Sequence, residues 1–160
     1  MGRKSIVLEG IVVGLAGAAA VAIWFLLYDI AEGAPFRTPA LLGAALFHGL
    51  RDAAALIVTP RLVLEYTVVH GLAFMLFGLA AVGLFALVDR ERRVLFAVFM
   101  LFCCFEVFEL AMITVLAAWL FNTLQPWTII GGNLVATLIM LAILFRDHSL
   151  SFGQLMTSAE

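Results

Sequence analysis

Four long apolar runs dominate the sequence, and short polar segments separate them. The runs cover residues 6–28, 61–88, 94–121 and 127–145. An α-helix rises 1.5 Å per residue, so about 20 residues cross the roughly 30 Å hydrocarbon core of a bilayer. Each run therefore predicts a transmembrane helix, and residues 1–145 are expected to form one all-α domain of four transmembrane helices. Residues 146–160 are expected to form a polar cytoplasmic tail.

The segment 39–58, between the first two runs, has a different pattern. Its uninterrupted apolar part ends before His48, and apolar runs this short are more often interfacial or re-entrant than spanning. On a helical wheel the large apolar side chains fall on one side and the small or polar ones on the other. The pattern predicts an amphipathic interfacial helix over the whole segment. His48, Arg51 and Asp52 are expected to meet solvent or lipid headgroups.

Prolines mark three expected helix starts. Thr38-Pro39 and Thr59-Pro60 each pair a good N-cap residue with proline at the first helical position. Pro126 follows a short uncharged turn and is equally well placed to begin the last run.

Composition excludes an ordinary soluble domain. The 160 residues are 65% hydrophobic and 12% charged, whereas soluble domains average about 45–50% apolar and 25% charged residues. Lipid can cover such a surface, so the bilayer is the first partner that the sequence predicts. The net charge of -2 and the absence of a basic tract give no indication of nucleic-acid binding.

The Lys and Arg residues are unevenly divided between the two expected membrane surfaces. Six lie on the side of the termini and three on the other: Arg3, Lys4, Arg90, Arg92, Arg93 and Arg146 against Arg37, Arg51 and Arg61. Cytoplasmic segments carry the excess of positive charge, so both termini are expected in the cytoplasm. The expected location is a bacterial inner membrane, with the interfacial helix on the outer side.

Small residues recur every four positions along the first run, at Gly10, Gly14, Ala18 and Ala22. Small side chains let helix backbones approach closely in lipid. The stripe can serve packing within the bundle, which we favour, or an interface with another chain.

Ionisable side chains lie inside the apolar runs, where a charged group costs at least about 2.5–3.5 kcal/mol on insertion scales. Glu106 and Glu109 are one helical turn apart and share a face. Counted from the outer surface, Asn133 lies about 10 Å deep, His70 about 13 Å and Glu109 about 18 Å. We expect Glu109 and His70 to approach each other, with Glu106, Asn133 and Tyr66 nearby. This polar pocket would open to the outer side.

Three functions fit such a pocket. Carboxylates and imidazole are ligands of iron and zinc, so His70, Glu106 and Glu109 could hold a transition metal. Intramembrane carboxyls also suit proton or cation transport. The third hypothesis, which we favour, is a helical subunit of a homo-oligomer or larger membrane complex. No Ser/His/Asp or Cys/His catalytic pattern is visible, so an enzyme is disfavoured.

Two neighbouring cysteines sit beside this carboxylate pair. Adjacent residues on a helix point about 100° apart, so Cys103 and Cys104 are not expected to form a disulfide with each other. Cys103 faces the side of Glu106, and Cys104 faces away.

Overall fold

The described part of the chain is helical throughout. The computed structural model describes residues 3–88, 94–117, 119–120 and 123–147, which include no β-strand. In chain order the elements are α1 (Arg3–Ala31), α2 (Arg37–His48), the 3₁₀ helix η1 (Ala53–Ala55), α3 (Pro60–Val88), α4 (Val94–Ala117) and α5 (Pro126–Asp147). Most of the expected polar tail, residues 148–160, lies outside the described residues.

Three of these helices are long and apolar enough to cross a membrane: α1 over Ile6–Ala31, α3 over Pro60–Leu87 and α5 over Pro126–Arg146. Their length and composition are those of an integral membrane protein in contact with lipid. In α4 the described apolar stretch is shorter and covers Phe96–Phe108.

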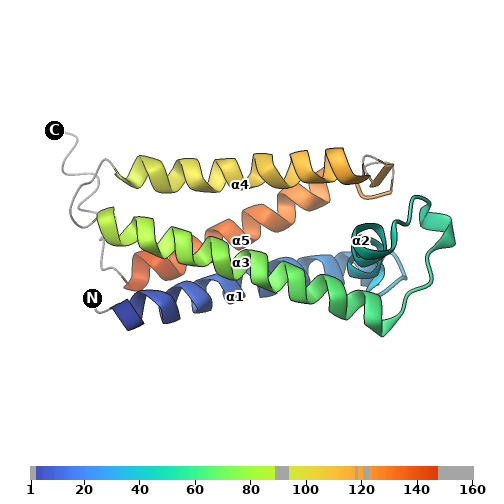
Figure 1. Cartoon of the computed structure of the whole chain (residues 1–160), viewed down its shortest axis with the longest axis horizontal. Coiled ribbons are helices and arrows are strands. Elements are labelled where there is room, and N and C mark those ends of the chain that lie inside the picture. Colours follow the sequence, from blue (N-terminus) through green and yellow to red (C-terminus); the bar gives the residue numbers. More distant parts are fainter. Residues whose placement is uncertain (1–2, 89–93, 118, 121–122, 148–160) are drawn as a thin grey trace.

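The four long helices run lengthwise through the molecule, and α2 crosses them at one end (Figure 1). The chain passes up and down, so α1 begins and α5 ends at the same end of the bundle. Figure 1 shows α2 nearly end-on at the opposite end. In a bilayer that contains the long helices, α2 would therefore lie close to the membrane plane.

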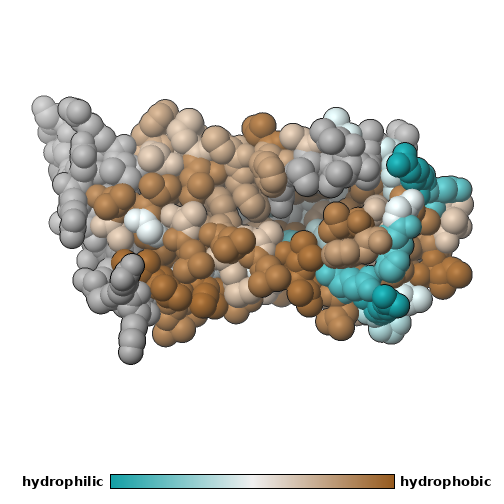
Figure 2. All heavy atoms as spheres, in the orientation of Figure 1, coloured by the Kyte–Doolittle hydropathy of each residue, from teal (hydrophilic) through white to brown (hydrophobic). Residues whose placement is uncertain are grey.

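An apolar belt covers the middle of the face seen in Figure 2, and hydrophilic side chains gather at the end occupied by α2 and η1. Large apolar side chains of α3 and α5 are more than half exposed, including Leu76 at 69% and Leu138 at 59%. This surface suits lipid rather than water, because contact of large apolar side chains with water is unfavourable.

Close backbone contact joins α1 to α3. A Cβ added at Gly14 would lie 2.3 Å from the carbonyl oxygen of Phe74, and one added at Gly78 would lie 2.3 Å from that of Gly10. Of the stripe of small residues in α1, Gly10, Gly14 and the buried Ala18 are used within the chain. Ala22 is exposed. The stripe thus supports packing inside the bundle, where small residues permit close approach.

The main core lies between α1, α3 and α5. Its fully buried side chains include Val13, Phe85, Met140 and Leu144. Near the α2 end, the indole of Trp24 lies against Gly131 and Gly132 and donates a hydrogen bond to the carbonyl oxygen of Thr128, at 2.9 Å. Because these two glycines have no side chain, the indole of Trp24 can pack directly against the backbone of α5.

The amphipathic helix expected over 39–58 is shorter than predicted. α2 ends at His48, because Gly49 adopts a left-handed conformation (φ 65°) and closes the helix with a backbone bond to Ala44. Glycine takes this conformation without a Cβ penalty. The chain then leads through η1 to α3. Arg51 and Asp52 are exposed, and the Asp52 carboxylate caps η1.

The expected N-cap role of Thr38 is also wrong. α2 begins two residues earlier than expected, at Arg37 after Phe36, and no side chain caps it. Thr38 instead bonds to Asp29 in the last turns of α1: its backbone N–H and its hydroxyl donate to the two carboxylate oxygens at 2.8 and 2.6 Å. Both residues are only 2% exposed. This buried bond pair fixes the corner between α1 and α2.

The other two expected helix starts agree with the structure. α3 begins at Pro60, and the hydroxyl of Thr59 accepts a 3.4 Å bond from the N–H of Leu62. α5 begins at Pro126. Proline suits the first helical turn because its missing N–H has no partner there.

Candidate intramembrane polar site

A carboxylate and an amide meet between α4 and α5. The amide nitrogen of Asn133 donates a 3.1 Å hydrogen bond to Oε2 of Glu106. Asn133 is buried, with 4% of its surface exposed, whereas Glu106 is only partly buried. Both residues lie well inside their apolar helices, so the pair sits at membrane depth. Intramembrane polar groups usually face a neighbouring helix and pair in this way.

His70 faces α1 rather than α4. Its Nε2 lies 3.3 Å from the carbonyl oxygen of Ala18. Because a carbonyl can only accept, Nε2 must carry the hydrogen of this bond. The imidazole stacks on Tyr66, with ring centres 5.6 Å apart, and also contacts Phe74 at 4.7 Å. The small side chain of Ala18 allows the ring to reach the backbone of α1.

Aromatic rings occupy the contact between α3 and α4. Phe105 packs against Phe74 and stacks on Phe77, with ring centres 5.6 and 4.2 Å apart. Phe102 meets Phe77 edge-on at 5.0 Å. Since Phe74 also contacts His70, these rings stand between the imidazole and the helix that carries Glu106. Edge-on and offset arrangements of this kind are the favourable ones for aromatic pairs.

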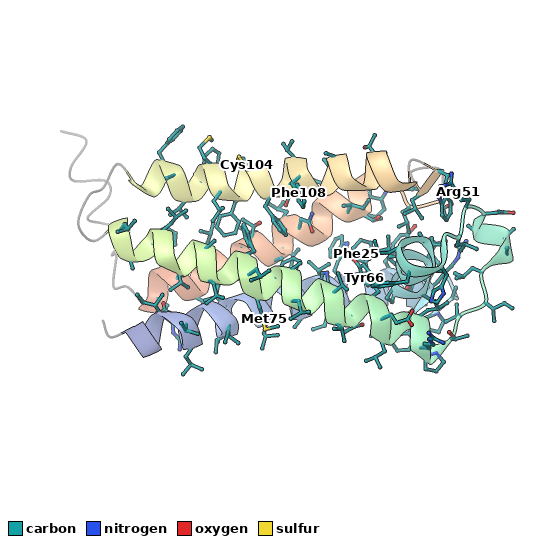
Figure 3. All side chains as sticks on the ribbon, viewed as in Figure 1. Phe25, Arg51, Tyr66, Met75, Cys104 and Phe108 are labelled. Atoms are coloured by element: carbon teal, nitrogen blue, oxygen red, sulfur yellow. The ribbon has the colours of Figure 1, made fainter. Side chains whose placement is uncertain are left out.

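The expected polar pocket therefore divides into two groups. The structure brings Glu106 together with Asn133, and Tyr66 together with His70. The side chain of Glu109 lies outside the described residues, so its expected approach to His70 stays a prediction. Figure 3 shows Tyr66 close to the α2 end of the bundle.

A metal centre gains no support from the residues described. Among them, no group of three or more His, Cys, Asp and Glu side chains could hold a metal ion. Metal sites in proteins need a set of converging ligands. The proposed ligands were His70, Glu106 and Glu109. Of these, the side chain of Glu109 lies outside the described residues.

The two cysteines are free and differ in exposure. Cys103 is partly buried and Cys104 is exposed. Figure 3 shows Cys104 on the side of α4 away from α3. Cys103 lies three residues before Glu106, so the two share a face of α4. The two thiols thus lie on different faces of α4.

Sequence reasoning missed two polar groups at the α2 end. One is the corner formed by Asp29 and Thr38, nine residues apart, of which only Thr38 was considered, as a helix cap. The other is centred on Glu65, whose two carboxylate oxygens each make a 2.8 Å contact, one with Nε2 of His48 and one with Nε of Arg61. Arg61 and Glu65 stand at i and i+4, a spacing that predicts such a pair. Nothing local predicts the contact with His48.

Comparisons with protein families, with curated proteins and with solved structures found no match. The function must therefore be argued from the residues of this chain.

Proposed function

We propose that the protein is a four-span membrane bundle that works as a subunit of a homo-oligomer, joined through α4. With 24 residues, α4 is about 36 Å long, enough to cross the hydrocarbon core as a fourth span. Four spans agree with Figure 1, where the start of α1 and the end of α5 lie at the same end of the bundle. The positive-charge bias places these ends in the cytoplasm, with α2 on the outer side of an inner membrane.

The observation that carries the proposal is the incomplete burial of Glu106. Its carboxylate accepts a hydrogen bond from the amide of Asn133, and the side chain remains partly exposed at membrane depth. An acidic group facing acyl chains costs on the order of 2.5–3.5 kcal/mol. Contact with another helix would lower this cost, so the membrane favours an assembly that covers the carboxylate.

The face of α4 around this carboxylate has the spacing of a helix–helix seam. Phe99, Cys103, Glu106 and Leu110 follow one another at intervals of four, three and four residues. All four are partly or fully exposed, Phe99 to 60%. Residues at this spacing form the line of contact between two helices that wind around each other. We call these four residues the Glu106 face.

A second copy of the chain is the simplest partner for the Glu106 face. Most oligomers are homo-oligomers, and a twofold dimer uses the same patch on both subunits. In such a dimer two Glu106 side chains would each gain cover from the other chain. The stripe on α1 is largely occupied by α3, which leaves α4 as the better surface for assembly.

Native mass spectrometry of the protein in a mild detergent tests the subunit role. We expect a dimer for the native sequence. Glu106→Ala removes the group whose cover drives association, so its dissociation constant should rise roughly threefold to thirtyfold, as for loss of one interhelical polar contact. The matched control Phe108→Ala changes a side chain that is 60% exposed on the opposite side of α4 and should leave the dimer intact.

A native protein that stays monomeric at all concentrations, or a dimer weakened equally by both variants, would contradict the subunit role.

Proton or cation handling by Glu106 is the second candidate, because an acidic group at membrane depth is typical of such paths. Glu106→Gln separates the two candidates. The neutral amide can still accept the bond from Asn133 and keep the dimer, but it cannot carry a proton. Proton flux into liposomes that the native protein supports and Glu106→Gln abolishes, with the dimer retained, would favour this second function.

A further inference from the structure

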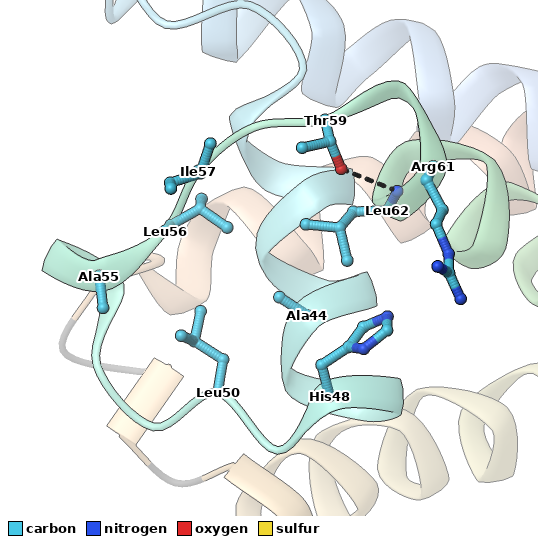
Figure 4. Close-up of a pocket in the computed structure, with 9 residues that line it drawn as sticks. All are labelled: Ala44, His48, Leu50, Ala55, Leu56, Ile57, Thr59, Arg61 and Leu62. Carbon is cyan, nitrogen blue, oxygen red and sulfur yellow. Dashed lines mark hydrogen bonds between the residues drawn. The ribbon is translucent and has the colours of Figure 1, made fainter.

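An open cavity of about 320 Å³ lies at the outer end of the bundle, away from the Glu106 face (Figure 4). It is bounded by the end of α2, the segment 50–59 and the start of α3. Leu50, Leu56 and Leu62 give it an apolar lining, and His48 and Arg61 stand at its polar side. Small-molecule pockets in proteins measure about 300–1,000 Å³, so this cavity is at the small end of that range.

The backbone creates this space. At Gly49 the chain leaves α2 in a left-handed conformation, and a Cβ there would meet no atom within 4 Å. The following segment then loops back beside α2 before it reaches the start of α3 (Figure 4). The loop between α2 and α3 thereby leaves an apolar hollow rather than a filled core.

A positive group stands at the edge of this apolar hollow. The side chain of Arg61 is 78% exposed, and its contact with Glu65 uses Nε. The two terminal guanidinium nitrogens take no part in this bond. A guanidinium binds phosphate with two parallel hydrogen bonds, so its outer edge suits a phosphate group.

The position of the cavity selects the kind of ligand. It lies where the apolar belt of the bundle gives way to the hydrophilic end in Figure 2. In a bilayer this is the level of the lipid headgroups, where cationic side chains and phosphates meet. A ligand at this level would have a phosphate beside Arg61 and an apolar part next to the leucines.

We propose that this cavity binds an anionic phospholipid, with the headgroup phosphate on Arg61 and the first part of an acyl chain against Leu50, Leu56 and Leu62. The site would tie one lipid of the outer leaflet to the α2–α3 corner. It depends on the membrane location of the bundle but not on pairing through α4. Loss of the dimer would therefore leave this proposal standing.

The test uses the full chain in nanodiscs and in detergent. Native mass spectrometry with added phosphatidylglycerol should show one tightly retained lipid per chain, and phosphatidylcholine should be retained less. Arg61→Gln should weaken phosphatidylglycerol binding by at least about fivefold, the effect of one cation at a lipid surface. The matched control Arg51→Gln removes an exposed arginine from the same end that does not line the cavity and should change little.

A second variant tests the apolar part of the site independently. Ala55 lines the cavity and is exposed, so Ala55→Phe can fill the space without disturbing a buried contact. It should reduce retention of the lipid while the helical circular dichroism signal is unchanged. Equal losses for Arg61→Gln and Arg51→Gln, equal retention of both lipids, or full retention by Ala55→Phe would overturn the proposal. Displacement of the lipid by millimolar inorganic phosphate would show a phosphate site without an acyl site, and would also overturn it.

Discussion

The variant Gly78→Ala is expected to lose about 2–3 kcal/mol of unfolding free energy, the upper part of the range for overpacking. Its new Cβ would lie 2.3 Å from the carbonyl oxygen of Gly10 and 2.6 Å from the backbone nitrogen of Gly14. Backbone atoms cannot rotate away as a side chain can, so α1 and α3 would have to separate. Separation would loosen the main core, because both helices supply its buried side chains.

Two glycines of the same helix provide matched controls. A Cβ at Gly71 or Gly83 would meet no atom within 4 Å. Alanine is a better helix former than glycine by up to about 1 kcal/mol, so Gly71→Ala and Gly83→Ala should be neutral or stabilising. Thermal unfolding in one detergent, followed by circular dichroism, compares the three variants. If Gly78→Ala unfolds at the same temperature as these controls, the described contact between α1 and α3 is incorrect.

Asp29→Ala is expected to destabilise the protein by about 2–4 kcal/mol. The substitution removes the acceptor for both the N–H and the hydroxyl of Thr38, which are buried at the corner between α1 and α2. A buried polar group that loses its partner costs about 1–3 kcal/mol. Thr38→Val removes only the hydroxyl and keeps the N–H bond, so its effect should be about half as large.

Asp52→Ala serves as the control for this prediction. Asp52 also lies at the α2 end and accepts one N–H bond, from Ala54 at 2.9 Å, but it is exposed. Water can replace that bond, so the loss should stay within about 1 kcal/mol. Urea or thermal unfolding in detergent measures all three variants. Equal effects of Asp29→Ala and Asp52→Ala would contradict a buried corner.

The sequence predicted the long helices well because each depends on a contiguous stretch of residues. Apolar runs and the helix starts at Pro60 and Pro126 are local features, and the structure places α3 and α5 accordingly. The end of α2 was also locally marked, by Gly49 directly after the last helical residue. The longer amphipathic helix was predicted from periodicity alone, without the helix end that Gly49 marks.

Features that depend on which helices are neighbours could not be predicted in the same way. Thr38 and Thr59 have the same local pattern, yet Thr38 bonds to Asp29 because the corner brings the end of α1 beside it. The depth of His70 followed from counting residues, but its direction did not. The glycine contacts place α1 beside α3, and the imidazole therefore meets the carbonyl of Ala18.

The pairing of Glu106 and Asn133 could be predicted only in part. Both residues were expected in the outer half to the middle of the membrane, and the fourth run follows the third through a short turn. Consecutive antiparallel helices joined by short turns usually lie side by side. Adjacency of the last two helices was therefore predictable, but the pair was not, because counting put Asn133 about 10 Å deep and Glu106 one turn below Glu109 at about 18 Å.

Disulfide cross-linking in native membranes tests the central claim most directly, because the chain carries one thiol on the Glu106 face and one on another face. After mild oxidation, pairing through this face predicts a covalent dimer that Cys103→Ser abolishes and Cys104→Ser preserves. Cys104 is the more exposed thiol, so random collisions would give the opposite dependence. A dimer that requires Cys104, or no dimer with either thiol, would contradict assembly through Glu106.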